Sequence, residues 1–108
     1  MAYQATFRYA RISPRKVRPL ADLVRGKFAD DALDVLSFMP HRGARMLEKV
    51  IRSALANAEE QRAQHMENLM ISDVRVDGGG MFKRLRPRAR GMANVVKRRM
   101  AHIHVELD

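Results

Sequence analysis

The side chains in this sequence that are best suited to chemistry are cations gathered in one block. Residues 78–100 contain eight basic residues and no acidic one: Lys83, Arg84, Arg86, Arg88, Arg90, Lys97, Arg98 and Arg99. A second group of five bases without an acid lies in residues 1–18: Arg8, Arg11, Arg15, Lys16 and Arg18. Because like charges repel, a block of one sign needs an external anion to stabilise it. The pattern predicts a polyanionic partner.

The rest of the chain has an ordinary charge balance. The 108 residues include 21 Lys and Arg against 12 Asp and Glu, which gives a net charge of +9 at pH 7. Residues 19–77 carry eight bases and ten acids, so nearly all of the excess lies in the two basic groups. No apolar run approaches the roughly 20 residues that a membrane span requires, and no signal peptide is recognisable. We therefore expect a soluble, cytoplasmic protein, and the charge favours nucleic acid or an anionic membrane surface as its partner.

Other groupings of reactive side chains are weaker. The chain has no cysteine, which excludes a disulfide scaffold, a thiolate zinc site and a cysteine nucleophile. His102 and His104 share a strand face, but no third metal ligand is near in the sequence, so we interpret them as residues of a face that meets RNA. Gly78-Gly79-Gly80 lacks the Gly-Lys-Ser/Thr sequence that would make a phosphate loop. We expect no enzymatic activity, no metal and no cofactor.

Two helices are predicted before residue 40. Ser13 and Pro14 are typical of a helix start, and Gly26 suits the left-handed residue that follows a helix. Pro19 lies inside this helix and predicts a kink or a one-turn irregularity, because it lacks a backbone donor. A second, short helix is predicted from about Asp30 to Phe38.

The third helix has the clearest periodicity in the chain. Apolar residues recur at steps of three and four, which predicts a buried face: Ala44, Leu47, Val50, Ile51, Ala54, Leu55 and Ala58. The opposite side is expected to be solvated and contains Arg45, Glu48, Lys49, Arg52 and Glu59.

Strand patterns stand at both ends of the sequence. In residues 5–11, Phe7 and Tyr9 are expected to share one strand face, which disfavours an amphipathic mitochondrial transit helix. In residues 69–76, the apolar residues stand first at odd positions (Leu69, Ile71) and then at even ones (Val74, Val76). This shift predicts a bulge near Ser72-Asp73, which would bring all four to one strand face. From Val95 to Leu107 apolar and polar residues alternate, as in a half-buried strand.

The stretch between the last two strands is too long for an ordinary loop. We interpret it as a β-hairpin that outgrows the sheet, with its turn near Pro87 to Gly91. Arms of about 10 residues would reach roughly 30 Å from the body. The sequence thus predicts a single α+β domain over residues 1–108, with a globular body (1–77 and 101–108) and a basic extended hairpin (78–100).

Several segments in order resemble a known family. They are Ser13-Pro14-Arg15-Lys16-Val17-Arg18, Ala21-Asp22-Leu23-Val24-Arg25-Gly26-Lys27, Ser53-Ala54-Leu55-Ala56-Asn57-Ala58-Glu59, Lys83-Arg84, Pro87-Arg88-Ala89-Arg90-Gly91, and Lys97-Arg98-Arg99 followed by His102-Ile103. Together they are similar to large-subunit ribosomal protein twenty-two, and the resemblance extends from about residue 8 to residue 106.

The resemblance implies a structural, non-enzymatic constituent of the large ribosomal subunit, with three helices packed on a three-stranded antiparallel sheet and a long protruding hairpin. Its implied partners are large-subunit (23S) ribosomal RNA, neighbouring large-subunit proteins and the nascent polypeptide, because the family's hairpin lines the exit tunnel near the macrolide site. No homo-oligomer is expected. The thirteen bases of the two groups and His102 are the expected RNA-binding residues. The alternative is an architectural DNA-binding protein that inserts a basic β-arm into the minor groove.

The sequence departs from the family pattern at a few positions. Asp77 is followed by Gly78-Gly79-Gly80 where the family has Glu-Gly-Pro, which predicts a looser hinge at the hairpin base. Met92 replaces a common Arg, and Pro19 replaces Leu. Met100 and Ala101 replace Thr-Ser, which removes two hydroxyls that could contact phosphate.

Overall fold

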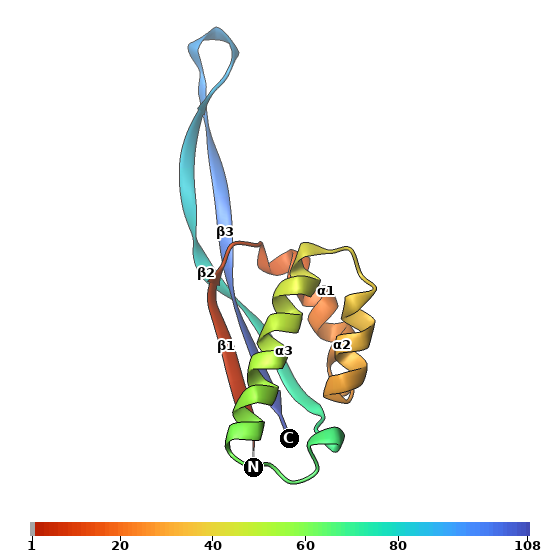
Figure 1. Ribbon diagram of the computed structural model, residues 1–108. Helices are drawn as coiled ribbons and strands as arrows, with labels where there is room; N and C mark the ends of the chain where they lie inside the picture. Colours follow the sequence, from red (N-terminus) through yellow and green to blue (C-terminus); the bar gives the residue numbers. More distant parts are fainter. Residues whose placement is uncertain (1) are drawn as a thin grey trace.

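The protein is an α+β fold, described for residues 2–108 in a computed structural model (Figure 1). The chain order is β1 (Tyr3–Ala10), α1 (Pro14–Val24), α2 (Ala29–Ser37), α3 (Arg42–Glu60), β2 (Ile71–Pro87) and β3 (Ala93–Leu107), with short 3₁₀ turns at Met66–Asn68 and Ala89–Gly91. The strands form one antiparallel sheet in the order β1-β3-β2. The predicted fold class is confirmed. None of the helices in residues 2–108 is long and apolar enough to cross a membrane.

The core lies between one face of the sheet and the helices (Figure 1). Helix α1 packs against β2, and α3 packs against β1 and β3. Helix α2 packs mainly on α3, so it forms an outer layer instead of covering the sheet directly. The largest fully buried side chains come from all of these elements except β1: Val17, Val24, Leu36, Leu47, Ile51, Ile71, Val74, Ile103, Val105 and Leu107.

Helix α1 begins and ends as the sequence predicts. Ser13 is the N-cap residue and Pro14 the first helical residue, while Gly26 has the left-handed φ of +85°. Helix α1 is unbroken from Pro14 to Val24 with Pro19 inside it, so the predicted one-turn irregularity is wrong, while the alternative of a kink stays a prediction. Pro19 and Arg15 are both exposed, so the carbonyl that loses its intrahelical donor can bind water instead.

Strand β1 ends in a bulge that the sequence does not reveal. Phe7 pairs with Ile103, but the next pair is Ala10 with Ala101, and Tyr9 has a φ of +58°. The additional residue reverses the alternation, so Ala10 turns inward and Tyr9 is 60% exposed. The expectation that Phe7 and Tyr9 share a face is therefore wrong.

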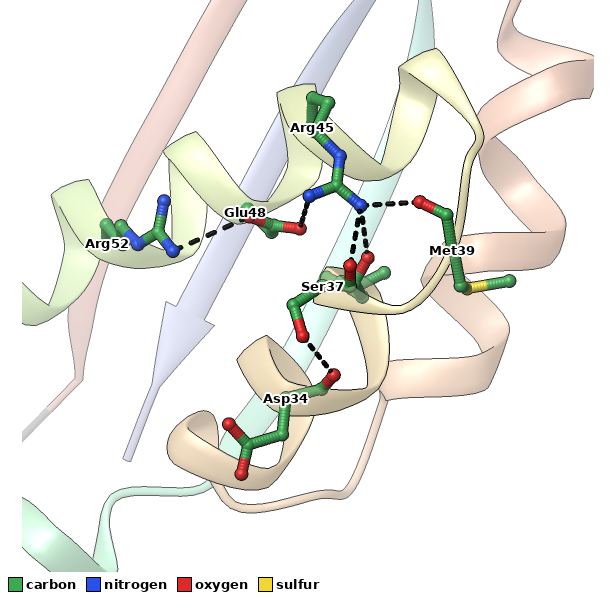
Figure 2. A network of polar contacts seen from close by, with 7 residues as sticks. Asp34, Ser37, Met39, Arg45, Glu48 and Arg52 are labelled. Atoms are coloured by element: carbon green, nitrogen blue, oxygen red, sulfur yellow. Dashed lines mark hydrogen bonds and ion pairs between the residues drawn. The ribbon is translucent and has the colours of Figure 1, made fainter.

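A polar network joins α2 to α3 (Figure 2). The Arg45 guanidinium donates hydrogen bonds to the carbonyls of Leu36, Ser37 and Met39, which lie at the C-terminal end of α2. Helix ends leave such carbonyls without intrahelical partners, and the helix dipole favours a cation there. Arg45 therefore caps one helix from the next.

The same network contains a buried carboxylate. Arg45 Nη1 lies 2.8 Å from Glu48 Oε1, and Arg52 Nη2 lies 3.5 Å from Glu48 Oε2. Only 4% of Glu48 is exposed, so its predicted place on the solvated side of α3 is wrong. Leu55, predicted in the core, is only partly buried at the core's margin. Helical periodicity places a face to within about one residue, and these two positions lie at its border.

The last two strands extend beyond the body. The register shifts between Ile71 and Asp73, which confirms the predicted bulge. β1 pairs with β3 only as far as Ala101, whereas β2 and β3 remain paired out to Pro87 and Ala93. The molecule measures 64 × 25 × 17 Å, and its length comes from this hairpin (Figure 1).

Candidate nucleic-acid interface

The hairpin register distributes the basic side chains over both faces of a two-stranded ribbon. Residues directly opposite each other point to the same face, and alternate residues along a strand do so too. From the pairs Lys83↔Lys97 and Met81↔Arg99, one face carries Lys83, Lys97 and Arg99. From the pairs Phe82↔Arg98, Arg84↔Val96 and Arg86↔Asn94, the other carries Arg84, Arg86 and Arg98. A ribbon charged on both faces is suited to a partner that surrounds it.

The pairing of Lys83 with Lys97 is unfavourable in the isolated chain. Like charges directly opposite each other on a sheet face destabilise the strand pair. All eight basic residues of 78–100 are exposed, and within residues 2–108 none of their side chains forms an ion pair or a hydrogen bond. The arrangement gains electrostatic energy only when an external anion lies beside the ribbon.

The tip of the hairpin is a tight turn with an arginine in an uncommon conformation. The Arg88 N–H donates to the Met92 carbonyl over 2.6 Å, which closes the turn. Arg90 has φ +62° and Gly91 has φ +69°, both in the left-handed region. This region is unfavourable for a residue with a side chain, whereas glycine adopts it readily. Arg88 and Arg90 are exposed at the farthest point from the core.

The N-terminal bases lie at the root of the hairpin. Arg8 belongs to β1, Arg11 to the following loop, and Arg15, Lys16 and Arg18 to the first turns of α1. Figure 1 places the end of β1 and the start of α1 at the end of the body from which the hairpin projects. All five residues are exposed. The fold thus brings the two basic groups of the sequence to the same end of the molecule.

Not every predicted base is equally available to a ligand. The Arg18 Nε–H donates to the Val76 carbonyl over 3.2 Å, so this side chain already binds the outer edge of β2. Arg25, which the sequence analysis did not single out, does the same at the Val74 carbonyl over 2.6 Å and forms an ion pair with Asp22. Arg42 donates to the carbonyl of Arg11. No spacing in the sequence reveals the bonds to the carbonyls of Val76, Val74 and Arg11, because each of them joins distant segments.

His102 lies at the base of the hairpin and contacts the bulge of β1. Its Nδ1 accepts the Tyr9 backbone N–H over 3.0 Å, and the two rings meet edge to face with centroids 4.7 Å apart. A neutral ring that accepts at Nδ1 carries its proton on Nε2. A Cβ at Gly79 would lie 3.1 Å from His102 Cε1, so the histidine ring packs closely over Gly79 and would have to shift by a few tenths of an ångström to admit a larger residue. His102 therefore has a bracing role whether or not it contacts RNA.

His104 does not join His102 in a metal site. Its Nδ1 lies 2.7 Å from the Thr6 hydroxyl oxygen, and its Nε2 lies 3.2 Å from Glu106 Oε1. Within residues 2–108, no three side chains of metal-ligating type gather.

Comparisons with known proteins show the family of the chain. The model of the ribosomal protein L22p/L17e family matches residues 5–108. The chain belongs to this family. The large ribosomal subunit protein uL22 of Rhodopirellula baltica is 58% identical over 110 residues, which cover 97% of this chain and 92% of that protein. The protein of the same name from Caldicellulosiruptor saccharolyticus is 50% identical over 103 residues, 95% of this chain and 84% of the relative.

A third relative covers the whole chain. The large ribosomal subunit protein uL22 of Desulfotalea psychrophila is 47% identical over 108 residues, which are 100% of this chain and 98% of that protein. The resemblance seen in the sequence motifs is therefore confirmed. Since the family consists of ribosomal proteins, membership also confirms that the chain is not an enzyme.

Proposed function

We propose that this protein is a structural constituent of the large subunit of the cytoplasmic ribosome, and that it binds large-subunit ribosomal RNA through the basic hairpin and the bases at its root. The observation that carries the proposal is the hairpin itself, with eight exposed cations, a Lys83-Lys97 cross-strand pair and no internal counter-charge in residues 2–108. Phosphate oxygens supply the missing anions.

The extended shape supports a finer assignment. Residues 78–100 form a narrow ribbon and the remaining residues form the body, so the hairpin can enter a space that the body cannot. With the family relationship, this shape supports a hairpin that lines the polypeptide exit tunnel, beside the nascent chain and neighbouring large-subunit proteins. Few aromatic side chains accompany the cations, which favours recognition of RNA backbone and shape over base reading.

The proposal is tested by measuring how RNA affinity depends on salt. If about 6 phosphates are neutralised, the plot of log affinity against log salt for a large-subunit RNA transcript has a slope near −4 to −5. A slope shallower than about −2 would exclude the hairpin as a phosphate-binding element. Duplex DNA of the same length, used as a competitor, tests the architectural DNA-binding alternative, which requires DNA to bind at least as tightly.

The tunnel assignment needs a test in cells. Arg88→Glu with Arg90→Glu places carboxylates at the tip, and we expect impaired large-subunit assembly or altered macrolide sensitivity. The matched control is Arg62→Glu, since Arg62 lies in the body and has a left-handed φ of +56°, close to that of Arg90. Normal subunit profiles and unchanged drug sensitivity in the tip variant would contradict contact with tunnel RNA.

A further inference from the structure

The two outer edges of the sheet are treated differently by the rest of the fold. On β2, the outward carbonyls of Val74 and Val76 accept hydrogen bonds from Arg25 and Arg18. Nearer the start of β2, Ile71 exchanges hydrogen bonds with the loop that follows α1, through Gly26 and Lys27. From Ile71 to Val76, the outward carbonyls of this edge are therefore capped.

The edge of β1 is closed only at its two ends. Because Tyr3, Ala5 and Phe7 pair with β3 residues whose backbone groups face β1, the alternate residues Gln4, Thr6 and Arg8 turn their own N–H and C=O groups outward. The Gln4 carbonyl accepts a hydrogen bond from the Asn57 side chain over 2.7 Å, as this geometry requires. Beyond β1, the Arg11 carbonyl accepts from Arg42.

Between these two capped carbonyls the edge is open. The outward backbone groups of Thr6 and Arg8 have no partner within residues 2–108. They border a hollow of about 310 Å³ between β1 and α3, whose floor is partly apolar. Its walls include Phe7 and Val50 together with Lys49, and the Lys49 amine lies 5.8 Å from the centre of the Phe7 ring.

We propose that the open β1 edge at Thr6 and Arg8 binds an extended polypeptide segment of another protein, which adds to the sheet as a fourth strand. The segment has alternating apolar and acidic residues. Its apolar side chains enter the hollow beside Phe7, Val50 and the stem of Lys49, and its acidic side chains lie near Arg8 on the other face of the sheet. The inference goes beyond RNA binding and does not depend on it.

The chemistry of the edge selects a polypeptide over RNA. A strand edge presents donors and acceptors in alternation at a fixed spacing, which another extended backbone matches. RNA phosphates are acceptors alone and would bring negative oxygens against the free carbonyls of Thr6 and Arg8. A second copy of this chain is also disfavoured, because it would bring two sets of Arg8 and Lys49 together.

The test measures amide hydrogen exchange at Thr6 and Arg8 in the full-length protein. The probe is an end-blocked peptide of alternating Val and Glu, and its control is the same peptide methylated on the backbone nitrogens of one edge. In the free protein we expect both amides to exchange as fast as exposed loop amides. One new hydrogen bond corresponds to about tenfold slower exchange when the unmethylated peptide is bound. The methylated peptide should have no effect.

Variants separate backbone pairing from charge. Thr6→Pro removes the outward N–H and the hydroxyl contact with His104 but no backbone hydrogen bond of the sheet, and it should abolish the protection at Arg8. Thr6→Val, which removes the hydroxyl and keeps the N–H, should preserve the protection. Arg8→Ala, which leaves the backbone groups in place, should weaken peptide binding, whereas Lys27→Ala should not. The proposal is overturned if the methylated peptide binds equally well or if neither amide is slowed. It also fails if protection in the free protein rises with protein concentration, or if an RNA transcript protects the same two amides.

Discussion

The body and the hairpin use the same residue type for opposite purposes. In the body, Arg18, Arg25 and Arg45 donate hydrogen bonds to backbone carbonyls of neighbouring segments. These arginines therefore stabilise the fold itself. In the hairpin, eight exposed cations have no such partner within the described chain, and two lysines face each other across the ribbon. The body is therefore built to be stable alone, whereas the hairpin is built to be stable with a partner.

The largest loss of stability is expected from a substitution in the core of the body, and a much smaller loss from deletion of the hairpin. Leu47 is fully buried, and Leu47→Ala should lower the free energy of unfolding by about 2–5 kcal/mol. Deletion of residues 82–91 removes only exposed side chains and should cost much less. Urea or thermal unfolding of both variants checks this, and equal losses would mean that the hairpin belongs to the cooperative core.

A smaller effect should come from the arginine that joins α2 to α3. Arg45→Ala removes the nearer ion-pair partner of the buried Glu48 carboxylate and the guanidinium donor of the Leu36, Ser37 and Met39 carbonyls, and should lower the free energy of unfolding by about 1–3 kcal/mol. Arg52→Ala is the control, since the side chain of Arg52 is 64% exposed and its pairing with Glu48 is long, so a loss below about 1 kcal/mol is expected. Similar losses in both variants would argue against the capping role of Arg45.

A third change should move stability and binding in opposite directions. Lys83→Glu replaces a repulsive cross-strand pair with an attractive one, and should stabilise the free hairpin by about 0.2–1 kcal/mol. The same change should weaken RNA binding and make its salt slope shallower by about 1. Amide exchange in the hairpin and RNA titrations measure the two quantities. Loss of both stability and affinity would mean that Lys83 has an unseen internal partner.

The smallest effect is expected at the tip. Arg90→Gly suits the left-handed backbone, so the turn should persist and the free energy of unfolding should change by less than about 1 kcal/mol. Arg90→Val should open the turn, because a β-branched residue is strained at positive φ. Exchange of the Arg88 amide, which closes the turn, reports the difference. If both variants keep the turn equally well, the left-handed conformation of Arg90 is not what shapes it.

Local signals in the sequence were enough to predict the elements. Ser13-Pro14, Gly26, the parity change at Ser72-Asp73 and the turn at Pro87 to Gly91 each act within a few residues, and the structure confirms all four. The bulge at Tyr9 was not predictable, because neither Gly nor Asn marks the left-handed position. What holds it is His102, which lies 93 residues away.

In the candidate site, too, features set by neighbouring residues were predictable, and features set by distant contacts were not. The hairpin cations were identifiable because they form a block without acids, and their contact with RNA stays a prediction. The internal bonds of Arg18 and Arg25 were hidden, since their partners lie 58 and 49 residues away and a backbone carbonyl has no signature of its own. Glu48 was misplaced because its burial depends on Arg45 closing over it from one turn away, with α2 beyond.

The contact between Gly79, His102 and Tyr9 lies at the base of the hairpin and fixes the direction in which the hairpin leaves the body. The hairpin extends roughly 30 Å past this point, so a rotation of about 10° at its base would carry the tip sideways by about 5 Å. That displacement exceeds the length of a hydrogen bond. Gly79→Ala would bring a methyl group to 3.1 Å from the His102 ring, and if the backbone gives way instead of the ring, Arg88 and Arg90 are displaced without being touched. For a protein of this shape, the angle between the hairpin and the body decides where the basic side chains of the tip lie.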